Sequence, residues 1–439
     1  MRTQQILMLI LALSLTRTTA RAADSGPIVS PQQIVSEALA HSHKLQSAGI
    51  ESQLMQARKN QAVSRSLPSL KIAASANSYN GLQDSAMGSF VFPAIEDRYS
   101  LQAELSQTVF TAGRISGARK AADFDRRAAE SALRSTDADL RLQALTAYWS
   151  WSKAHFALAA TQAAVKRVES HNRDVKNQKD SGMATESDAL SAEVLMDQTI
   201  LRKQDAQRNL DLARATTAFM VGRELAADAI PQKPNAATLS AIQAVKEVPA
   251  IEAAMTNRPE RLRAEMAVRS AHEQVVVNRS AYYPQLSLVA RYEQARPNNL
   301  FFPPVDEWND DTFVGAVAAW NLFEGGLTRA KVVEAASREK QARLQAEEVT
   351  EAIALEVKQA RIRLDAAIAR LAVSQRAEKS AERNLEVTRN QWISGTTRHS
   401  DVLDAESKYA DAQYESVVSA GDAVLAKASM DHAMGVLGK

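Results

Sequence analysis

The sequence predicts a mainly α-helical protein with a small β part, built from two copies of one unit. Three observations support this prediction: a gapless match between residues 177–192 and 390–405, two long segments with a helical apolar period, and a pair of short alternating segments before each. Each long segment has roughly 65 residues, which at ~1.5 Å per residue is about 100 Å of helix. No compact globular domain contains such a helix, so we expect an elongated molecule.

The match between the two stretches predicts a two-fold internal repeat. Both contain Asn-Gln, Ser-Gly, Ser-Asp, Leu and Ala at the same spacing. Each stretch lies between two apolar-periodic segments, so we expect each to form the tip of a helical hairpin, at residues 181–187 and 394–400. Gly182 and Gly395 adopt positive φ at low cost, which suits them to end a helix.

A serine and an aspartate follow each tip glycine. We expect Ser187 to cap the second helix of its hairpin, which places Asp188 in the first turn, where the helix dipole favours an acid. Ser400 and Asp401 hold the same positions in the second hairpin. The repeat thus predicts the same kind of cap at both tips.

Composition and charge exclude several classes of protein. Basic and acidic residues nearly balance, at 53 and 51, and no basic stripe marks a nucleic-acid groove. The absence of cysteine rules out disulfides, thiol chemistry and a lipidated N-terminal cysteine. The sequence has no nucleophile, phosphate-binding or metal-ligand motif, so we expect no enzyme activity, no cofactor and no bound metal.

Residues 1–22 are typical of a secretory signal peptide. Arg2 supplies a positive charge, an apolar run follows, and Ala-Arg-Ala at the end of the segment fits a signal-peptidase site. The apolar run is too short to span a bilayer as a helix. We expect the mature chain to begin near Ala23 and to leave the cytoplasm. The alternative is a helix buried at the N-terminus.

The first unit is predicted to span residues 23–222. Its elements, in chain order, are a helix over 31–65, a β-hairpin over about 68–110, a long helix over 114–180, the tip, and a returning helix over 186–220. Ser30 is suited to cap the first helix, because Pro31 follows it at the first helical position.

Residues 223–249 are predicted to be an irregular linker with short helical pieces, since three prolines interrupt them. The second unit, residues 250–439, repeats the pattern of the first. Its elements are a helix, a β-hairpin over about 284–323 whose second strand covers 312–323, a long helix over 327–393, the tip, and a final helix over 400–436.

The four predicted strands imply an assembly of several chains. Each strand has ~10–12 residues and one apolar face, as a tilted transmembrane strand requires. Membranes admit β-structure only as a closed barrel, because an open edge leaves backbone groups unpaired in lipid. The smallest barrels have about eight strands. One chain supplies too few, whereas a dimer would supply eight strands and a trimer twelve.

The second tip, Ser-Gly followed by Asp401-Val-Leu-Asp404, resembles that of the TolC-type outer-membrane efflux proteins, as do the two-fold repeat and the Asn-x-Pro-Glu helix start at residues 257–260. The resemblance covers essentially the whole mature chain. It implies a homotrimer in outer-membrane lipid, with four strands per chain in one twelve-stranded barrel above a periplasmic tube of twelve helices. It also implies a passive exit duct for efflux or type I secretion, joined by a periplasmic adaptor (a membrane fusion protein) to an inner-membrane pump of RND or ABC type.

The resemblance assigns roles to residues at the two tips. Asp401 and Asp404 would form two rings of carboxylates at the periplasmic aperture, which would attract cations. Gly182 and Gly395 match the glycines near which adaptors dock.

The latch that holds the family's aperture closed is altered in this sequence. Trp392 stands at the position of a tyrosine, and its indole donates a hydrogen bond but accepts none. Thr397 stands at the position of an arginine, with Arg398 one residue later. Ser187 and Asp188 stand where the family has a Thr-Asp pair.

Each of these assignments has a plainer alternative. Asp401 would be only a helix-start acid, and Trp392 only a core aromatic. The whole chain would be a periplasmic coiled-coil adaptor without a pore, although adaptors carry one helical hairpin flanked by compact β domains and this sequence predicts two hairpins. The sequence does not identify the cargo, because drugs, metals and polypeptides all leave through ducts of this type.

Overall fold

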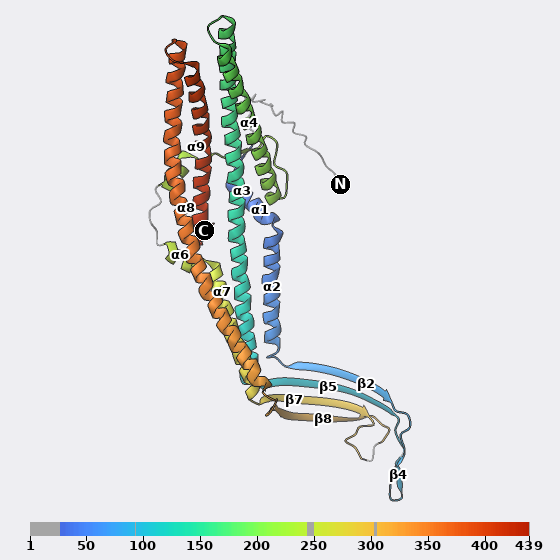
Figure 1. Cartoon of the computed structure of the whole chain (residues 1–439). Helices are drawn as coiled ribbons and strands as arrows, with labels where there is room; N and C mark the ends of the chain where they lie inside the picture. The colour runs from blue at the N-terminus through green and yellow to red at the C-terminus, as the bar shows by residue number, and fades with distance from the viewer. Residues whose placement is uncertain (1–26, 93, 244–249, 303–304, 439) are drawn as a thin grey trace, which may run out of the picture.

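The computed structural model describes residues 27–92, 94–243, 250–302 and 305–438, and the predicted signal peptide, residues 1–22, lies outside them. Figure 1 shows a long helical stalk, with the tips of two hairpins at one end and a four-stranded sheet that bends away at the other. None of the helices in the described residues is apolar over a stretch long enough to cross a bilayer.

Two short helices open the fold where the sequence predicts one. α1 (Pro31–His41) begins at Ser30, whose hydroxyl accepts from the backbone N–H of Gln33 at 3.2 Å, as predicted. α2 (His43–Ser64) follows at once. The prediction of a single helix over 31–65 is therefore wrong. Ser42 interrupts it by taking an extended conformation, and its hydroxyl caps α2 by accepting from the N–H of Leu45.

The two long helices have the predicted bounds. α3 (Arg114–Asp180) and α8 (Leu327–Ile393) have 67 residues each. Each follows a glycine with positive φ, Gly113 at 95° and Gly326 at 86°, so the chain turns sharply from the sheet into the helix. The returning helices are α4 (Glu186–Val221) and α9 (His399–Ala433).

Short elements brace the middle of the stalk. β1 (Ile28–Val29) pairs in parallel with β6 (Ile230–Pro231), which lies in the predicted linker. α5 (Ala236–Gln243) also lies in this linker. α6 (Ala250–Asn257), α7 (Pro259–Arg279) and the single turn η1 (Ser280–Tyr282) open the second repeat, and α7 runs along α3 and α8 to the sheet.

The sheet is antiparallel, with strand order β2-β5-β7-β8. Its strands are β2 (Ser69–Ser78), β5 (Asp97–Phe110), β7 (Gln285–Arg296) and β8 (Asn309–Ala319). A small hairpin, β3 (Ser85–Met87) and β4 (Phe90–Phe92), extends from the loop between β2 and β5.

The predicted bounds of the last strand, 312–323, are wrong at both ends. β8 begins at Asn309, inside the predicted loop, and ends at Ala319. Beyond Ala319 the chain turns towards α8, and the indole N–H of Trp320 donates to the carbonyl of Tyr282 at 3.1 Å. The apolar residues over 320–323 therefore belong to the bend and not to the strand.

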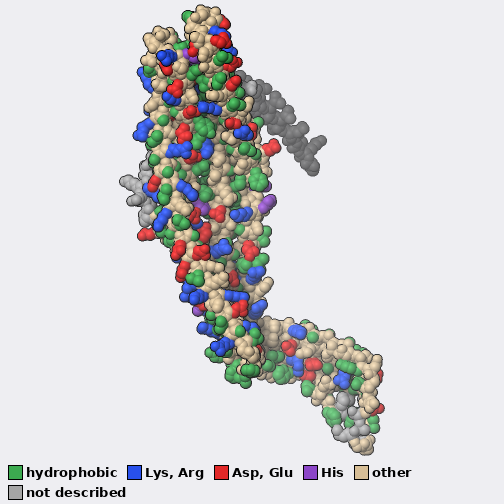
Figure 2. Space-filling model, in the orientation of Figure 1, with side chains coloured by type: hydrophobic (Ala, Val, Ile, Leu, Met, Phe, Trp, Pro, Cys, Tyr) green, Lys and Arg blue, Asp and Glu red, His purple; other side chains and the backbone are tan. Residues whose placement is uncertain are grey.

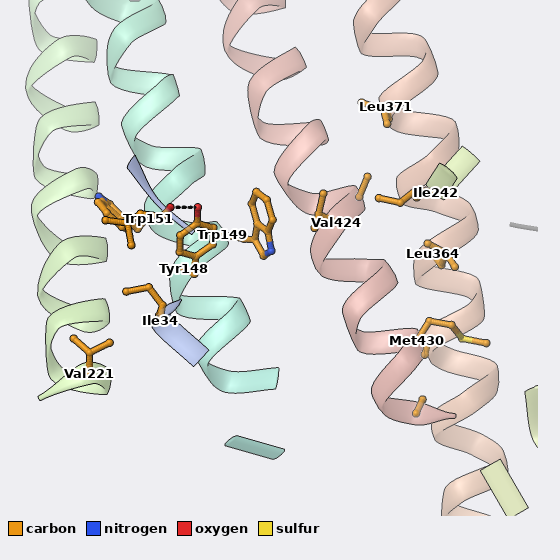
Figure 3. Packing of buried hydrophobic residues seen from close by; sticks show 14 of the residues in the cluster. Ile34, Tyr148, Trp149, Trp151, Val221, Ile242, Leu364, Leu371, Val424 and Met430 are labelled. Atoms are coloured by element: carbon orange, nitrogen blue, oxygen red, sulfur yellow. Dashed lines mark hydrogen bonds between the residues drawn. The ribbon is translucent and has the colours of Figure 1, made fainter. Parts of the chain in front are cut away.

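The main core lies at mid-stalk, where α3 meets the short elements. Tyr148 and Trp151 of α3 are fully buried, and the Tyr148 hydroxyl donates to the carbonyl of Val29 at 2.8 Å and accepts from the N–H of Gln232 at 2.7 Å. Burial raises the pKa of Tyr148 to about 12. Figure 3 shows Trp149 between α3 and α9, so one stretch of α3 binds both halves of the molecule.

The helices pack in one curved layer. Near the tips the order of neighbours is α8, α9, α3, α4, and near the sheet it is α8, α7, α3, α2. The strands follow the same order across the layer as the helices. β2, which follows α2, lies at one edge of the sheet, and β8, which precedes α8, lies at the other. Each repeat thus forms one half of the layer from tip to sheet.

Candidate functional site

The two hairpin tips are turns of the same design. At the first, the N–H of Gly182 donates to the carbonyl of Lys179 at 2.9 Å, and φ of Gly182 is 78°. At the second, the N–H of Gly395 donates to the carbonyl of Trp392 at 2.9 Å, and φ of Gly395 is 74°. A Cβ at either glycine would meet nothing within 4 Å among the described residues. The turn therefore requires glycine at each position because of its positive φ, and both glycines lie at the surface.

The residues that cap the returning helices differ from the prediction. At the first tip the cap is Thr185, whose hydroxyl accepts from the N–H of Asp188 at 3.2 Å, while the Asp188 carboxylate accepts from the N–H of Thr185 at 3.0 Å. This reciprocal pair is a capping box. Ser187, the predicted cap, lies inside the first turn, because α4 starts one residue before it.

The second tip uses only half of that arrangement. α9 starts at His399, so the predicted cap Ser400 is also inside the helix. The Asp401 carboxylate accepts from the N–H of Arg398 at 3.2 Å and from the hydroxyl of Thr397 at 2.7 Å. A guanidinium has no acceptor, and the N–H of Asp401 instead donates to the carbonyl of Arg398 at 3.1 Å.

The two predicted aperture acids lie on the exposed face of the second tip. The hydrogen bond from Thr397, and then that from the backbone of Arg398, lowers the pKa of Asp401, so this carboxyl is ionised at neutral pH. Asp404, one turn along α9, pairs with Lys408 at 2.5 Å, and its side chain is 61% exposed. The second tip therefore presents one carboxylate that is hydrogen-bonded within its own cap and one that is paired with a lysine.

The predicted latch residues are not all brought together. Asp188 is held in its own cap, and Arg398 is exposed. Trp392 reaches the first hairpin and packs against the buried cluster that Val175 forms with two alanines of α4.

Two histidines that the sequence analysis does not single out complete the contact of Trp392. The ring of His171 on α3 lies 5.2 Å from that of Trp392 and stacks at 4.7 Å on the ring of His399 on α9. His171 is only 5% exposed. A single histidine on an apolar helical face gives no sequence signal of its distant partner. Within one chain, the contact between the hairpins at this level is therefore a stack of rings, and the polar latch remains a prediction.

Ion pairs tie the two hairpins together below the rings. All of them join α9 to the first hairpin: Arg167 to Glu406 at 3.4 Å, Arg202 to Asp411 at 2.7 Å, and Lys153 to Asp422 at 2.9 Å. Glu406 is 3% exposed, and burial raises the pKa of its carboxyl. The pairs fix the height of one hairpin relative to the other.

A cluster of charges around the buried side chains of Arg258 and His432 lies at the level where α9 ends. Arg258, 8% exposed, bonds Glu260 at 2.9 Å and Glu356 of α8 at 2.7 Å. His432 lies between Glu356 and Asp139 of α3, with its Nε2 2.9 Å from Asp139. The hydrogen bond between His432 and Glu356 is the main reason that the pKa of Glu356 is lowered to about 2. The same bond raises the pKa of His432. We call these five residues the stalk clamp.

The two faces of the sheet differ in chemistry, as predicted. On one face Leu70 opposes Leu105, Ala74 opposes Leu101, and the side chains are exposed, with Leu70 at 68%. The apolar face continues on β7 and β8 with Leu288, Tyr292 and Val314. The other face carries paired serines, with Ser69 bonded to Ser106 and Ser75 to Ser100, each at 2.8 Å.

Aromatic residues lie at both ends of the sheet. At the end near the stalk, Tyr283 is 58% and Phe323 is 88% exposed. At the far end the rings of Tyr99 and Trp308 lie 6.2 Å apart, and those of Phe92 and Phe302 lie 5.7 Å apart. Figure 2 shows hydrophobic side chains gathered where the sheet leaves the stalk, whereas both signs of charge are interspersed along the stalk itself.

Both sides of the layer are unpartnered in a single chain. β2 and β8 are the edge strands of the sheet, and α2 has no buried residue. α4 and α8 each carry exposed apolar residues. On α4 these are Leu190, Val194, Leu201, Leu212 and Phe219; on α8 one regularly spaced set of them is Val333, Leu344, Leu355, Ile362 and Val373. On α8 they recur at intervals of seven or eleven residues, which places them on one helical face.

Within the described residues, no three His, Asp or Glu side chains gather closely enough to hold a metal ion. A cavity of about 810 Å³ opens at mid-stalk, lined by apolar residues of α1 and α9 together with Trp149 and Ile242. This cavity lies beside α1, α3, α5 and α9 at mid-stalk, away from the tips.

Comparison with known proteins gives one family and one fold. The family model for outer membrane efflux proteins matches residues 34–223 and 250–436. No curated protein matches the sequence.

Several solved structures share the whole architecture. A crystal structure of CusC, described in relation to transmembrane channel formation, superposes with a TM-score of 0.78 at 20% identity, covering 92% of each chain. The outer membrane protein VceC from Vibrio cholerae gives 0.77 at 19% identity, covering 92% of this chain and 96% of that one. The open state of the Neisseria gonorrhoeae outer membrane channel MtrE gives 0.77 at 18%, covering 92% and 88%.

Proposed function

Because this chain belongs to the outer membrane efflux protein family, we propose that three copies form the exit duct of a tripartite efflux system. Members of this family are transport channels of the outer membrane, and the chain is therefore an efflux duct and not an enzyme. The trimer, its partners and its passive mode of conduction are the proposal. The open sides of the helical layer and of the sheet are the observation that carries it.

The unpaired edges support a closed ring of chains. A free strand edge in lipid leaves a row of backbone groups without partners. Joining β8 of one copy to β2 of the next satisfies both edges, and the same step brings α8 against α4 of the next copy. Such a head-to-tail contact generates a ring when the rotation closes. Three copies give twelve strands, which exceeds the roughly eight that the smallest barrels need.

The chemistry of the two sheet faces supports the placement of the barrel. The apolar face, with Leu70, Leu105 and Leu288, would contact lipid, and the serine face would line the lumen. Aromatic residues at both ends of the sheet match the girdles that mark the two membrane interfaces. Strand β7, with 12 residues, has the length for a tilted crossing.

The stalk then extends into the periplasm, and the hairpin tips would form its constricted end. Asp401 and Asp404, three of each in the trimer, would ring the aperture. Gly182 and Gly395, at the outermost turns, would lie where a periplasmic adaptor docks. The pump beyond the adaptor, of RND or ABC type, would supply the energy, while the duct conducts passively. We also propose that the chain is exported by a cleaved signal peptide, residues 1–22, and is not lipidated.

Reconstitution tests the proposal. The purified protein is expected to require detergent, to migrate as a heat-sensitive trimer on a gel, and to conduct ions across a planar bilayer. The matched control is the same preparation after heating, which should yield single chains and no current. A chain that is soluble and monomeric without detergent, and that leaves the bilayer unchanged, would end the duct hypothesis.

A further inference from the structure

The contact between the two hairpins nearest their tips is made by aromatic and imidazole rings. His171 comes from the first hairpin, and Trp392 and His399 come from the second. The two imidazoles stack with an angle of 15° between their planes, and the indole meets His171 at 64°. Val175 and Ala189 close the site from the side of the first hairpin.

The ring nitrogens in this contact lack the partners that a charged imidazole needs. Among the described residues, no hydrogen bond of good geometry reaches Nε2 of His171 or either nitrogen of His399, and only the backbone of Asp188 comes close enough to His399 to favour its charged form. A buried polar group without a partner already costs free energy, and a buried unpaired charge costs far more. The stack therefore tolerates two neutral imidazoles and resists a proton on either.

Charged groups approach the stack from all four helices. Arg389 of α8 repels a proton on His171, and Asp188 of α4 attracts one on His399. Arg167 of α3 and Glu406 of α9 pair with each other nearby. Burial is the main reason that the pKa of His171 is lowered to about 4, and the nearby positive charges of His399 and Arg389 lower it further. Burial also lowers the pKa of His399.

We propose that His171 and His399 form an acid-labile clasp, which holds the two hairpin tips together while both rings are neutral and lets them part when either ring is protonated. The inference rests on the proposed role of the tips as the constriction of the duct, since parting of the tips would widen it. The cost of a buried, unpaired charge on one ring supplies the driving force, and repulsion adds to it once both rings are charged. The clasp would make the periplasmic end of the duct responsive to acid.

The direction of the response follows from linkage. A histidine whose pKa is lower in the closed clasp than in the open one binds more protons when open, so acid favours opening. For His171 the closed value is about 4 and the ordinary value 6.5. Closure is therefore fully favoured above pH ~6.5 and weakens as the pH falls towards 4. From pH 7.5 to 5 the ratio of open to closed tips should rise about 30-fold from His171 alone.

Glu406 opposes this response. Burial raises the pKa of its carboxyl, so the closed form takes up that proton more readily, and acid favours closure at this residue. Replacing Glu406 by Gln removes the opposing effect and should enlarge the opening seen at the acid end of the range.

Distances between spin labels at the two tips test the clasp. The sequence has no cysteine, so Met183→Cys and Ile393→Cys, at side chains 76% and 70% exposed, place one label on each tip. Pulsed electron paramagnetic resonance on the whole protein in detergent would measure the distance distribution from pH 7.5 to 4.5. Samples with a single label supply the distances between subunits. We expect a longer-distance population that grows with acid.

The matched control replaces both histidines by phenylalanine, which keeps the ring stack and cannot be protonated. This variant should hold the neutral-pH distribution throughout the range. The pair His171→Gln and His399→Gln serves the same purpose if the phenylalanine variant does not fold, as judged by its helix content. An unchanged distribution in the wild-type protein down to pH 4.5, or the same change in the phenylalanine variant, would overturn the clasp. The measurement does not use conduction, so failure of the clasp and failure of the duct are distinguishable.

Discussion

Arg258 and Glu356 join α7 to α8 through two hydrogen bonds, Nη2 to Oε2 at 2.7 Å and Nη1 to Oε1 at 3.1 Å. The arginine side chain is 7% exposed and also bonds the carbonyl of His432 at 3.3 Å. The guanidinium thus joins three helices of the second repeat. Through His432 and Asp139 the stalk clamp also reaches α3 of the first repeat.

Breaking the stalk clamp should destabilise the stalk. Arg258→Ala leaves Glu356 and Glu260 without their cation. Because the side chain of Glu356 is 43% exposed, the loss should lie between the ~1 kcal/mol of an exposed pair and the ~3 kcal/mol of a fully buried one. Thermal unfolding followed by circular dichroism would detect the loss. The control is Arg269→Ala, because Arg269 pairs with Glu265 on an exposed face of α7, where a pair contributes at most about 1 kcal/mol. Equal losses in the two variants would contradict the role of the clamp.

The stalk clamp should also have a stability optimum in pH. The pKa of Glu356 is lowered to about 2, so its contribution is complete above pH ~4.5 and is lost as the pH falls towards 2. The pKa of His432 is raised, so its contribution is complete below pH ~6.5 and is lost as the pH rises through its folded value.

The variant His432→Gln isolates the alkaline side of that optimum. Since Gln does not titrate, the variant should be less stable than the wild type at pH 6 and should lose less stability between pH 6 and 9. Melting temperatures measured across this range would test both expectations. A wild-type melting temperature that stays constant from pH 6 to 9 would show that His432 does not contribute to the pH dependence of stability.

The aperture hypothesis concerns the exposed acids of the second tip. Replacing both Asp401 and Asp404 by Asn removes six carboxylates from the proposed trimer, so multivalent cations added on the periplasmic side should block single-channel current several-fold more weakly. Asp205→Asn is the control, because Asp205 is an exposed acid of α4 paired with Arg208 at 2.9 Å. Unchanged block in the double variant would place these acids outside the aperture.

The docking hypothesis concerns the tip glycines. Bulky residues at Gly182 and Gly395 should abolish export while trimers remain in the membrane, because nothing in the described chain lies within 4 Å of a Cβ at either position. Positive φ adds strain of about 1 kcal/mol or more. Gly81 is a matched control, since its φ is 83° and its surroundings are equally open, but it lies in the loop beyond β2. Normal export in the tip variant would contradict docking there.

The sequence predicts the long elements well because their ends are marked chemically. Gly113 and Gly326 start the 67-residue helices, and Gly182 and Gly395 follow their ends, each with positive φ. The alternation of the strands predicts the two faces of the sheet. Both features are local, and the internal repeat presents each of them twice.

The details that the sequence does not predict depend on geometry or on distant residues. Thr185 caps α4 instead of Ser187 because α4 starts at Glu186, two residues before a helix capped by Ser187 would start, and both types of side chain are suitable caps. His171 meets His399 only because α9 packs against α3. The roles proposed for Asp401, Asp404 and the tip glycines remain predictions.

Cross-linking between the open sides of the helical layer tests the central claim most directly. Val194→Cys on α4 and Val387→Cys on α8 are 56% and 39% exposed, and they lie at similar heights because one is 8 residues and the other 6 residues from the tip end of its helix. A short thiol cross-linker applied to the double variant should give a ladder that ends at three chains, while either single variant should give no ladder. A ladder that ends at two chains, one that continues beyond three, or only single chains would contradict the trimeric duct.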